Sequence, residues 1–290
     1  MAVSTIAQNR IVRSLGSLQR RDRRLLWGYG LLSLLLVVLA EWGAFYFSMA
    51  EYFGVEVIVL RASIYVFLAL ILWGTILKIN RHQIANLLWR EQEHFEAILS
   101  AYDSAIALKD PYTGGHGRRV AAYAATIAEA MGLDESKIER IYHAGLLHDI
   151  GKLATPDLVL KKPHKLTFDE FKKIREHPGV GAEIIEKIPQ LRKLAPAVRH
   201  HHERFNGCGY PHSLAALRIP LEARIIAVAD VLDAMSSDRS YRPALSWERA
   251  LSEIRQMAGT YFDPQIVAML FEEPCRSALN RLHEKAREAE

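Results

Sequence analysis

Two long apolar runs near the start of the chain constrain its fold more than any other feature. The first runs from Leu25 to Met49 with Glu41 as its one charged residue, and the second runs from Val55 to Leu77. Each is long enough, at about 1.5 Å per residue, to cross a hydrocarbon core of about 30 Å as a helix. We therefore expect residues 25–79 to form a transmembrane helical hairpin with a short outer turn. A buried hairpin in a soluble protein is the alternative.

Basic residues flank these runs on one side only. Residues 1–24 contain six arginines, and Lys78, Arg81 and Arg90 follow the second run, whereas the gap between the runs has no lysine or arginine. The positive-inside rule then places both ends in the cytoplasm. We expect a basic cytoplasmic segment at 1–24, a multi-pass protein of the inner membrane, and the lipid bilayer as a partner. The chain has only two cysteines, which fits a reducing compartment.

The next segment, residues 80–108, contains neither glycine nor proline, and its apolar residues recur at spacings of three and four. This periodicity predicts one amphipathic helix that links the membrane part to the rest of the chain. Its apolar stripe either packs on the following domain or forms a homodimer contact with a second copy.

The remainder of the chain carries helical patterns and helix-end signals. Gly132 is placed to close one helix and Asp134 to cap the next, while Thr167 and Glu170 have the spacing of a capping box. Strand signals are weak. The sequence therefore predicts an all-α fold.

Within that fold we expect one helical domain over residues 109–275 and a helical tail over 276–290. The formal net charge of +4 is too small to indicate a nucleic-acid polymer as a partner.

Histidines and aspartates cluster at the ends of the predicted helices. They are His116, His148, Asp149, His177, His201, His202 and Asp230, with Asp233 one turn further on. Taken singly, each has a plain explanation as a cap or a surface residue. Asp230, however, lies in an apolar run where an unpaired carboxylate is costly, and a bound cation would remove that cost.

Imidazole and carboxylate ligands suit first-row divalent metals, and this set is too large for one catalytic ion and suitable for two. Two ions about 3.5–4 Å apart form a clamp for attack on a phosphodiester. Lys152 is placed to neutralise a phosphate oxygen.

Six motifs, in order, carry a family resemblance. They are DPYTGGHGRRV, HDIGK at 148–152, KLTFDEF, HHERFNGCGYP at 201–211, IPLEARIIAVADVLDAM and DRSYR. Over roughly residues 100–275 the chain resembles the HD-GYP family of bacterial phosphohydrolases. The resemblance implies metal-dependent hydrolysis of cyclic di-GMP to pGpG or GMP.

The resemblance also implies roles for individual residues. The metal ligands would be His116, His148, Asp149, His177, His201, His202 and Asp230. Asp149 and Lys152 would be catalytic. The substrate would contact Lys152, Gly209, Tyr210, Pro211, Arg239 and Arg242, because a guanidinium suits both stacking on a base and gripping phosphate.

Two positions depart from the family pattern. Family members with a third metal tend to have a glutamate where this chain has Tyr112, so we expect two divalent ions. Iron or manganese is expected ahead of cobalt or nickel. Asn206 replaces a usual aspartate, and an asparagine also caps such a turn. The remaining histidines His143, His200 and His212 are interpreted as structural or surface residues.

Two alternatives to a cyclic di-GMP phosphodiesterase stay open. The same metal site could act on another cyclic dinucleotide or nucleotide. A catalytically silent module that binds a cyclic dinucleotide is the other alternative, although a silent site has no need of a complete ligand set.

Overall fold

The computed structural model describes residues 35, 37–39, 41–42, 55–110, 115–162, 164–238 and 243–289. The chain divides into two compact units, residues 1–95 and 96–290, and each is described by itself. Within the described ranges the regular elements are helices, and only isolated bridges such as Asn206–Ala215 have β character. The all-α prediction therefore agrees with the structure.

The hairpin expected over residues 25–79 is not supported. Most of its first run lies outside the described residues, and the positions of that run that are described are helical. Among the described residues one helix, in the stretch beginning at Val59, is long and apolar enough to cross a membrane by length and composition. The basic segment 1–24 also lies outside the described residues.

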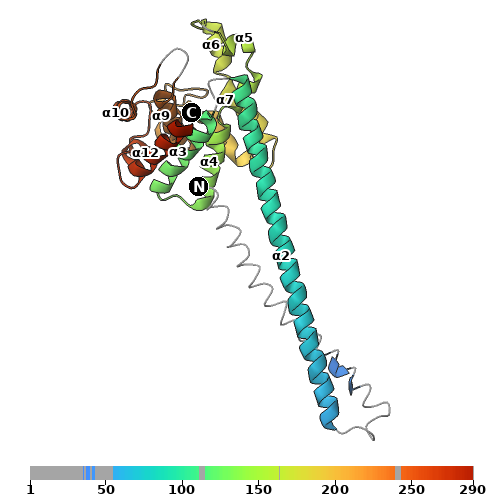
Figure 1. Ribbon diagram of the computed structural model, residues 1–290. Coiled ribbons are helices and arrows are strands. Elements are labelled where there is room, and N and C mark those ends of the chain that lie inside the picture. Colours follow the sequence, from blue (N-terminus) through green and yellow to red (C-terminus); the bar gives the residue numbers. More distant parts are fainter. Residues whose placement is uncertain are drawn as a thin grey trace. The chain divides into compact units, whose positions relative to one another are not determined.

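The helix α2 (Val55–Lys109) joins two segments that the sequence separated. The expected second span and the expected linker helix 80–108 form one continuous helix of 55 residues (Figure 1). In the unit 96–290, Leu99 and Ile106 of this helix are buried. These two residues of the apolar stripe therefore pack on the following domain, as the first of the two expectations had it, whereas Ile98 is 52% exposed and the homodimer contact stays a prediction.

The unit 96–290 contains ten further helices in the described ranges. They are α3 (His116–Ala130), α4 (Glu135–Leu147), α5 (Asp157–Leu160), α6 (Phe168–Ile174), α7 (His177–Glu186), α8 (Ala195–His200), α9 (Leu221–Ser236), α10 (Trp247–Gln256), α11 (Pro264–Met269) and α12 (Cys275–Ala289). Short 3-10 turns lie between them, at η2 (Ile150–Ala154), η3 (Arg192–Leu194) and η4 (Ala216–Arg218).

Local sequence signals start and stop several of these helices as predicted. Gly132 adopts a positive φ directly after α3, and the Asp134 side chain accepts a hydrogen bond from the amide of Lys137 at the start of α4. Thr167 and Glu170 form a reciprocal capping box at α6. These caps satisfy backbone amides that a helix cannot satisfy internally.

The helices α3, α4 and α9 form the centre of the domain, with α7 and α8 packed beside them (Figure 1). Alanine-rich α3 buries Val120, Ala124 and Ile127 at helical spacing, and α9 buries Ile225 and Leu232. Burial of each large aliphatic side chain contributes roughly 1.5–3 kcal/mol. This core holds the ends of several helices around the middle of α9.

The helical tail belongs to the same unit. Helix α12 packs against α3. The Trp247 indole in α10 donates a hydrogen bond to the Asn280 side chain at 2.6 Å and stacks on the His283 ring of α12. The unit therefore extends from the end of α2 to the end of α12.

Candidate metal centre

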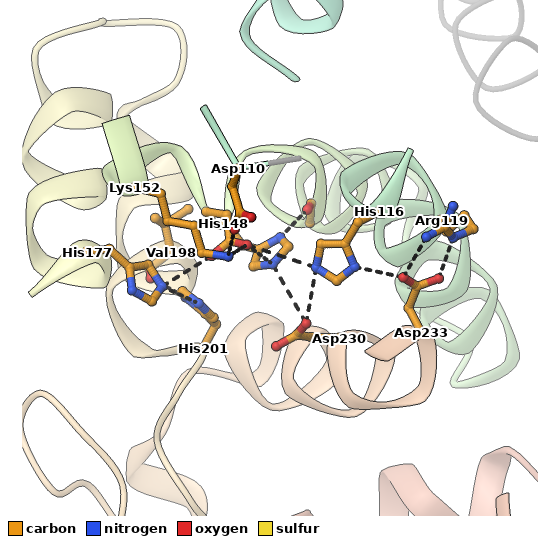
Figure 2. A network of polar contacts seen from close by, with 12 residues as sticks. Asp110, His116, Arg119, His148, Lys152, His177, Val198, His201, Asp230 and Asp233 are labelled. Carbon is orange, nitrogen blue, oxygen red and sulfur yellow. Dashed lines mark hydrogen bonds and ion pairs between the residues drawn. The ribbon is translucent and has the colours of Figure 1, made fainter. Parts of the chain in front are cut away.

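The seven histidines and aspartates singled out as metal ligands come together in one buried or half-buried centre. Their positions share a logic, because each lies at a helix end except for one in the middle of α9. They are His116 at the start of α3, His148 and Asp149 after α4, His177 at the start of α7, His201 and His202 after α8, and Asp230 in α9. Figure 2 labels five of them: His116, His148, His177, His201 and Asp230.

The first group of ligands consists of His116, His148 and Asp230, whose ligand atoms all lie within 4.8 Å of one another. Oδ1 of Asp230 is 3.3 Å from Nε2 of His116 and 3.9 Å from Nε2 of His148. The carboxylate thus faces both imidazoles from the opposite helix.

The second group consists of His177, His201 and His202, again with ligand atoms within 4.8 Å of one another. Nε2 of His177 is 3.4 Å from Nε2 of His201. The His201 and His202 rings lie side by side, with centroids 4.1 Å apart.

Asp149 lies between the two groups. Its Oδ1 is 3.2 Å from Nε2 of His177, in the second group. Its Oδ2 is 3.4 Å from Nε2 of His148 and 4.0 Å from Nε2 of His116, in the first group. One carboxylate therefore offers a separate oxygen to each group, which is the arrangement of a bridging ligand.

Backbone carbonyls fix the orientation of three of the imidazoles. Nδ1 of His148 donates to the Gly145 carbonyl, and Nδ1 of His177 and of His201 donate to the carbonyls of Ile174 and Val198, each at 2.7 Å. With the proton held on Nδ1, the Nε2 atom of each neutral ring presents a bare lone pair to the centre.

The lone pairs that face each other show whether these residues fit a metal ion. Nε2 of His177 and Nε2 of His201 face each other at 3.4 Å, and both rings already use Nδ1 as donor. Two lone pairs so placed repel each other unless a cation lies between them. Neutral imidazoles and carboxylates form a donor set for borderline divalent ions. The residues therefore fit a metal centre.

Burial and the charges around the centre strongly shift the pKa values of several of its side chains. Burial alone would raise the pKa of Asp149, but the charge of Lys152 and the adjoining imidazoles of His148 and His177 hold that pKa well below the usual value. Asp230 behaves similarly, because burial would raise its pKa but the bond to His116, together with the imidazoles of His148 and His202, lowers it. Burial and the neighbouring His177 lower the pKa of His202 to about 3. Both carboxylates are thus ionised and His202 is neutral at pH 7, as metal ligands need to be.

Asp233 and Arg119 support the centre from outside the ligand set. Oδ2 of Asp233 accepts a hydrogen bond from Nδ1 of His116 at 2.7 Å. The Arg119 guanidinium donates to both oxygens of Asp233, at 2.7 and 3.2 Å. Sequence reasoning noted Asp233 without giving it a role and did not consider Arg119. One feature of the sequence could have indicated the role of Asp233. It is a second carboxylate one turn after Asp230 in the same apolar helix.

Lys152 lies between two carboxylates at the edge of the centre (Figure 2). Its Nζ is 2.8 Å from Oδ2 of Asp149 and 3.1 Å from Oδ2 of Asp110, the residue directly after α2. Burial opposes the charged form, but these two carboxylates raise the pKa of Lys152 above its usual value. Lys152 is therefore a fixed positive charge. Sequence reasoning missed Asp110 as its second partner.

The glycine at position 151 allows the HDIGK turn to lie against α7. A Cβ on Gly151 would meet the backbone of His177 and Gly181, so only glycine permits this approach. This approach brings Asp149, the residue directly before η2, to within 3.2 Å of His177.

The segment Gly209–Pro211 lies beside the second group. The Tyr210 ring is 4.9 Å from the His202 ring between centroids, and the Arg175 guanidinium lies 4.4 Å above the Tyr210 ring. Gly209 packs on the backbone of Glu203 and Arg204, where a Cβ has no room. The structure thus places Gly209, Tyr210 and Pro211 next to the centre, and adds Arg175, which sequence reasoning missed.

Three expectations fall on positions outside the described residues. Arg239 and Arg242, the expected substrate contacts, and Tyr112, on which the expectation of two ions rested, all lie there. Asn206 is described, and its side chain accepts a hydrogen bond from the Cys208 amide at 3.0 Å, as expected for a turn cap.

The fold and the site together define the class of protein. It is an all-helical domain that holds a buried histidine–aspartate centre suited to divalent ions. The HD domain family model matches residues 101–266, which is more than half of the chain. The chain belongs to the HD domain family, whose centre is metal-dependent.

Curated relatives carry names of cyclic dinucleotide phosphodiesterases. The cyclic di-GMP phosphodiesterase response regulator RpfG of Xanthomonas campestris is 40% identical over 181 residues, 62% of this chain and 48% of its own length. The 3'3'-cGAMP-specific phosphodiesterase 3 of Vibrio cholerae is 35% identical over 192 residues, 66% of this chain and 41% of its own. The chain thus spans about half or less of the length of these relatives.

A solved structure supports the fold. A cyclic GMP-AMP specific phosphodiesterase of V. cholerae matches with a TM-score of 0.51 and 20% identity, over 65% of this chain and 52% of that one. At this identity the match shows the fold alone.

Proposed function

We propose that the chain is a metal-dependent phosphodiesterase that hydrolyses cyclic di-GMP. The observation that carries this proposal is the position of Asp149, whose two oxygens face two separate histidine groups. Such a bridged pair of sites suits two divalent ions, and two-ion centres cleave phosphate esters. The relative named RpfG, a cyclic di-GMP phosphodiesterase, supports the choice of substrate.

When bound, the ions would supply an activated water and neutralise charge that develops on the phosphate. His116, His148 and Asp230 would hold one ion, and His177, His201 and His202 the other. Asp149 would bridge them. The product, pGpG or GMP, depends on whether the linear dinucleotide is released or cleaved again.

Lys152 would bind a non-bridging phosphate oxygen. Its Nζ already lies 2.8 Å from the bridging Asp149, so a phosphate held at the centre would meet this charge at once. Asp110 would hold the flexible lysine side chain in that direction. A fixed charge of this kind stabilises the transition state without reorganisation.

Tyr210 and Arg175 would form a wall for the nucleobase. The guanidinium stacked on the phenol ring fixes the ring plane, and the ring lies next to His202. A base stacked there would bring the adjacent phosphate towards the ions. Arg239 and Arg242 remain proposed contacts to guanine or phosphate on the strength of the family resemblance.

The identity of the cyclic dinucleotide has a second candidate. Relatives named as 3'3'-cGAMP-specific phosphodiesterases are 35% and 36% identical over a similar part of this chain. The two substrates differ in one base, so contacts to the base and not the metal centre would decide between them.

Iron or manganese is the proposed metal, with cobalt and nickel as alternatives, because histidine–aspartate sites accept all four. The proposed location is the inner membrane with the HD domain in the cytoplasm. Its support is the exposed apolar surface of α2, including Ile64, Phe67 and Leu68. Retention in the membrane pellet after alkaline carbonate extraction is the expected result, and release into the supernatant would contradict it.

The decisive experiment measures turnover of both cyclic dinucleotides. The full chain, purified in detergent without oxygen, is supplied with Fe(II) or Mn(II) and assayed beside the double variant His148→Ala/Asp149→Ala. We expect pGpG or GMP from cyclic di-GMP with the native chain alone. Faster cleavage of 3'3'-cGAMP would support the second candidate. A metal-loaded, folded native chain that cleaves neither substrate would contradict the proposed function.

A further inference from the structure

A second cluster of metal-binding side chains lies outside the seven-residue centre. It consists of His200, Glu203 and His212, whose ligand atoms all lie within 4.8 Å of one another. His200 is the last residue of α8, and His212 directly follows Pro211. We call this set the outer cluster.

The imidazole of His200 is oriented in the same way as the imidazoles of the centre. Its Nδ1 donates to the carbonyl of Pro196, one turn back in α8, at 2.8 Å. Its Nε2 is therefore a bare lone pair when the ring is neutral, as in His148, His177 and His201. A backbone carbonyl behind the ring is the usual support of a metal-ligating histidine.

The second imidazole lies at a distance that fits a shared ion. Nε2 of His200 is 3.0 Å from Nδ1 of His212, and the two rings are tilted by 47°. Two nitrogens that bind the same ion, each at about 2.0–2.1 Å, lie roughly 2.9–3.4 Å from each other. The pair therefore needs little movement to take an ion between its nitrogens.

Glu203 supplies a carboxylate that is already held in place. It is 3% exposed, and its two oxygens accept hydrogen bonds from the amides of His212 at 2.7 Å and Leu214 at 3.1 Å. These bonds attach the backbone of residue 212 to Glu203, three residues after the end of α8. Each oxygen has a further lone pair for an ion.

We propose that the outer cluster binds a divalent transition ion of the borderline class, Zn²⁺ or Ni²⁺. Two imidazoles and one carboxylate suit this class, whereas Ca²⁺ and Mg²⁺ take oxygen ligands. His212 is exposed, so water completes the coordination. The ion ties the end of α8 to the residue after Pro211, and so restrains the segment that carries Tyr210.

The test counts zinc ions on the full chain. Chelator-stripped native protein and its variants are dialysed against low micromolar free Zn²⁺, and bound zinc is measured by elemental analysis. We expect His212→Ala and His200→Ala each to bind about one ion fewer per chain than native. His164→Ala, which changes another exposed histidine, serves as the matched control and should bind as many ions as native.

The double variant His148→Ala/Asp149→Ala separates this site from the central one. It should lose ions of the centre, while adding His212→Ala to it should remove about one more. Circular dichroism of the stripped proteins checks that the variants fold. Native stoichiometry in folded His212→Ala would overturn the proposal and leave the His200–His212 pair as a hydrogen bond.

Discussion

Nδ1 of His116 donates a hydrogen bond to Oδ2 of Asp233 across 117 positions of sequence, at 2.7 Å. This bond turns Nε2 of the same ring towards Asp230 and the centre. Burial would lower the pKa of His116, but the bonds to Asp230 and Asp233 raise it to about 9. The ring therefore carries a proton at pH 7 that an incoming ion must displace.

Replacing Asp233 should weaken metal binding although the residue is not a proposed ligand. In Asp233→Asn the amide is a weaker acceptor for His116 and loses the charge that Arg119 clamps. Loss of such an outer partner typically costs about 10–100-fold in metal affinity. Competition titration with Mn²⁺ measures the change, and Glu222→Gln in the first turn of the same helix is the control. Equal affinity in the two variants would contradict the supporting role of Asp233.

Removing the charge of Lys152 should slow hydrolysis without emptying the centre. In Lys152→Met the phosphate loses a fixed positive partner, and we expect kcat to fall by roughly 10²–10³-fold. Metal content, measured on the same sample, should stay at the native level because no proposed ligand changes. Lys162→Met removes a lysine that pairs with Glu170 instead and should keep native kcat. Native kcat in Lys152→Met would exclude the proposed phosphate contact.

Helix ends could be predicted because their signals are local. Asp134 caps α4 through the amide of Lys137, and Thr167 and Glu170 cap each other within four residues. The seven ligand candidates could also be singled out from the sequence. Each histidine or aspartate lies in a motif of the family, and these motifs follow one another in the order typical of that family.

The outer partners could not be predicted because they join distant segments. Arg119 and Asp233 lie 114 positions apart, and Lys152 meets Asp110 across 42. Only packing of α3 on α9, and of η2 near the end of α2, brings them together. The sequence pattern also predicted two separate segments where the hydropathy of α2 changes. The structure has one continuous helix there, because the backbone hydrogen bonds of a helix do not depend on side-chain hydropathy.

Acid should destabilise the metal-free protein through His202. The folded pKa of about 3 lies below the ordinary value of 6.5, so the unfolded chain takes a proton that the folded chain refuses. Its contribution to stability is therefore lost as the pH falls below 6.5. Between pH 7 and 5 the unfolding free energy of the stripped native chain should fall relative to His202→Gln, by up to about 1.4 kcal/mol per pH unit.

Denaturant unfolding at several pH values, in the presence of chelator, measures this difference. His164→Gln, an exposed histidine, should follow the native curve. A constant gap between native and His202→Gln over this range would contradict the lowered pKa. Bound metal should leave the effect in place, because an ion on His202 excludes the proton from the folded state while the unfolded chain still takes one.

Adding one methyl group at Gly151 should displace the centre as a whole. The new Cβ would meet the backbone of His177 and Gly181, which cannot rotate aside, so η2 and α7 must separate. Overpacking of this kind costs roughly 1–3 kcal/mol. Since Asp149 and Lys152 flank Gly151, metal affinity should fall with stability.

Gly179→Ala is the matched control in α7, because the nearest neighbour of its Cβ would be the Arg199 guanidinium at 4.0 Å. That variant should be as stable as native or slightly more so, since alanine favours a helix. Urea unfolding and Mn²⁺ titration of both variants make the comparison. Equal values for the two would show that the close approach of η2 to α7 does not hold the centre.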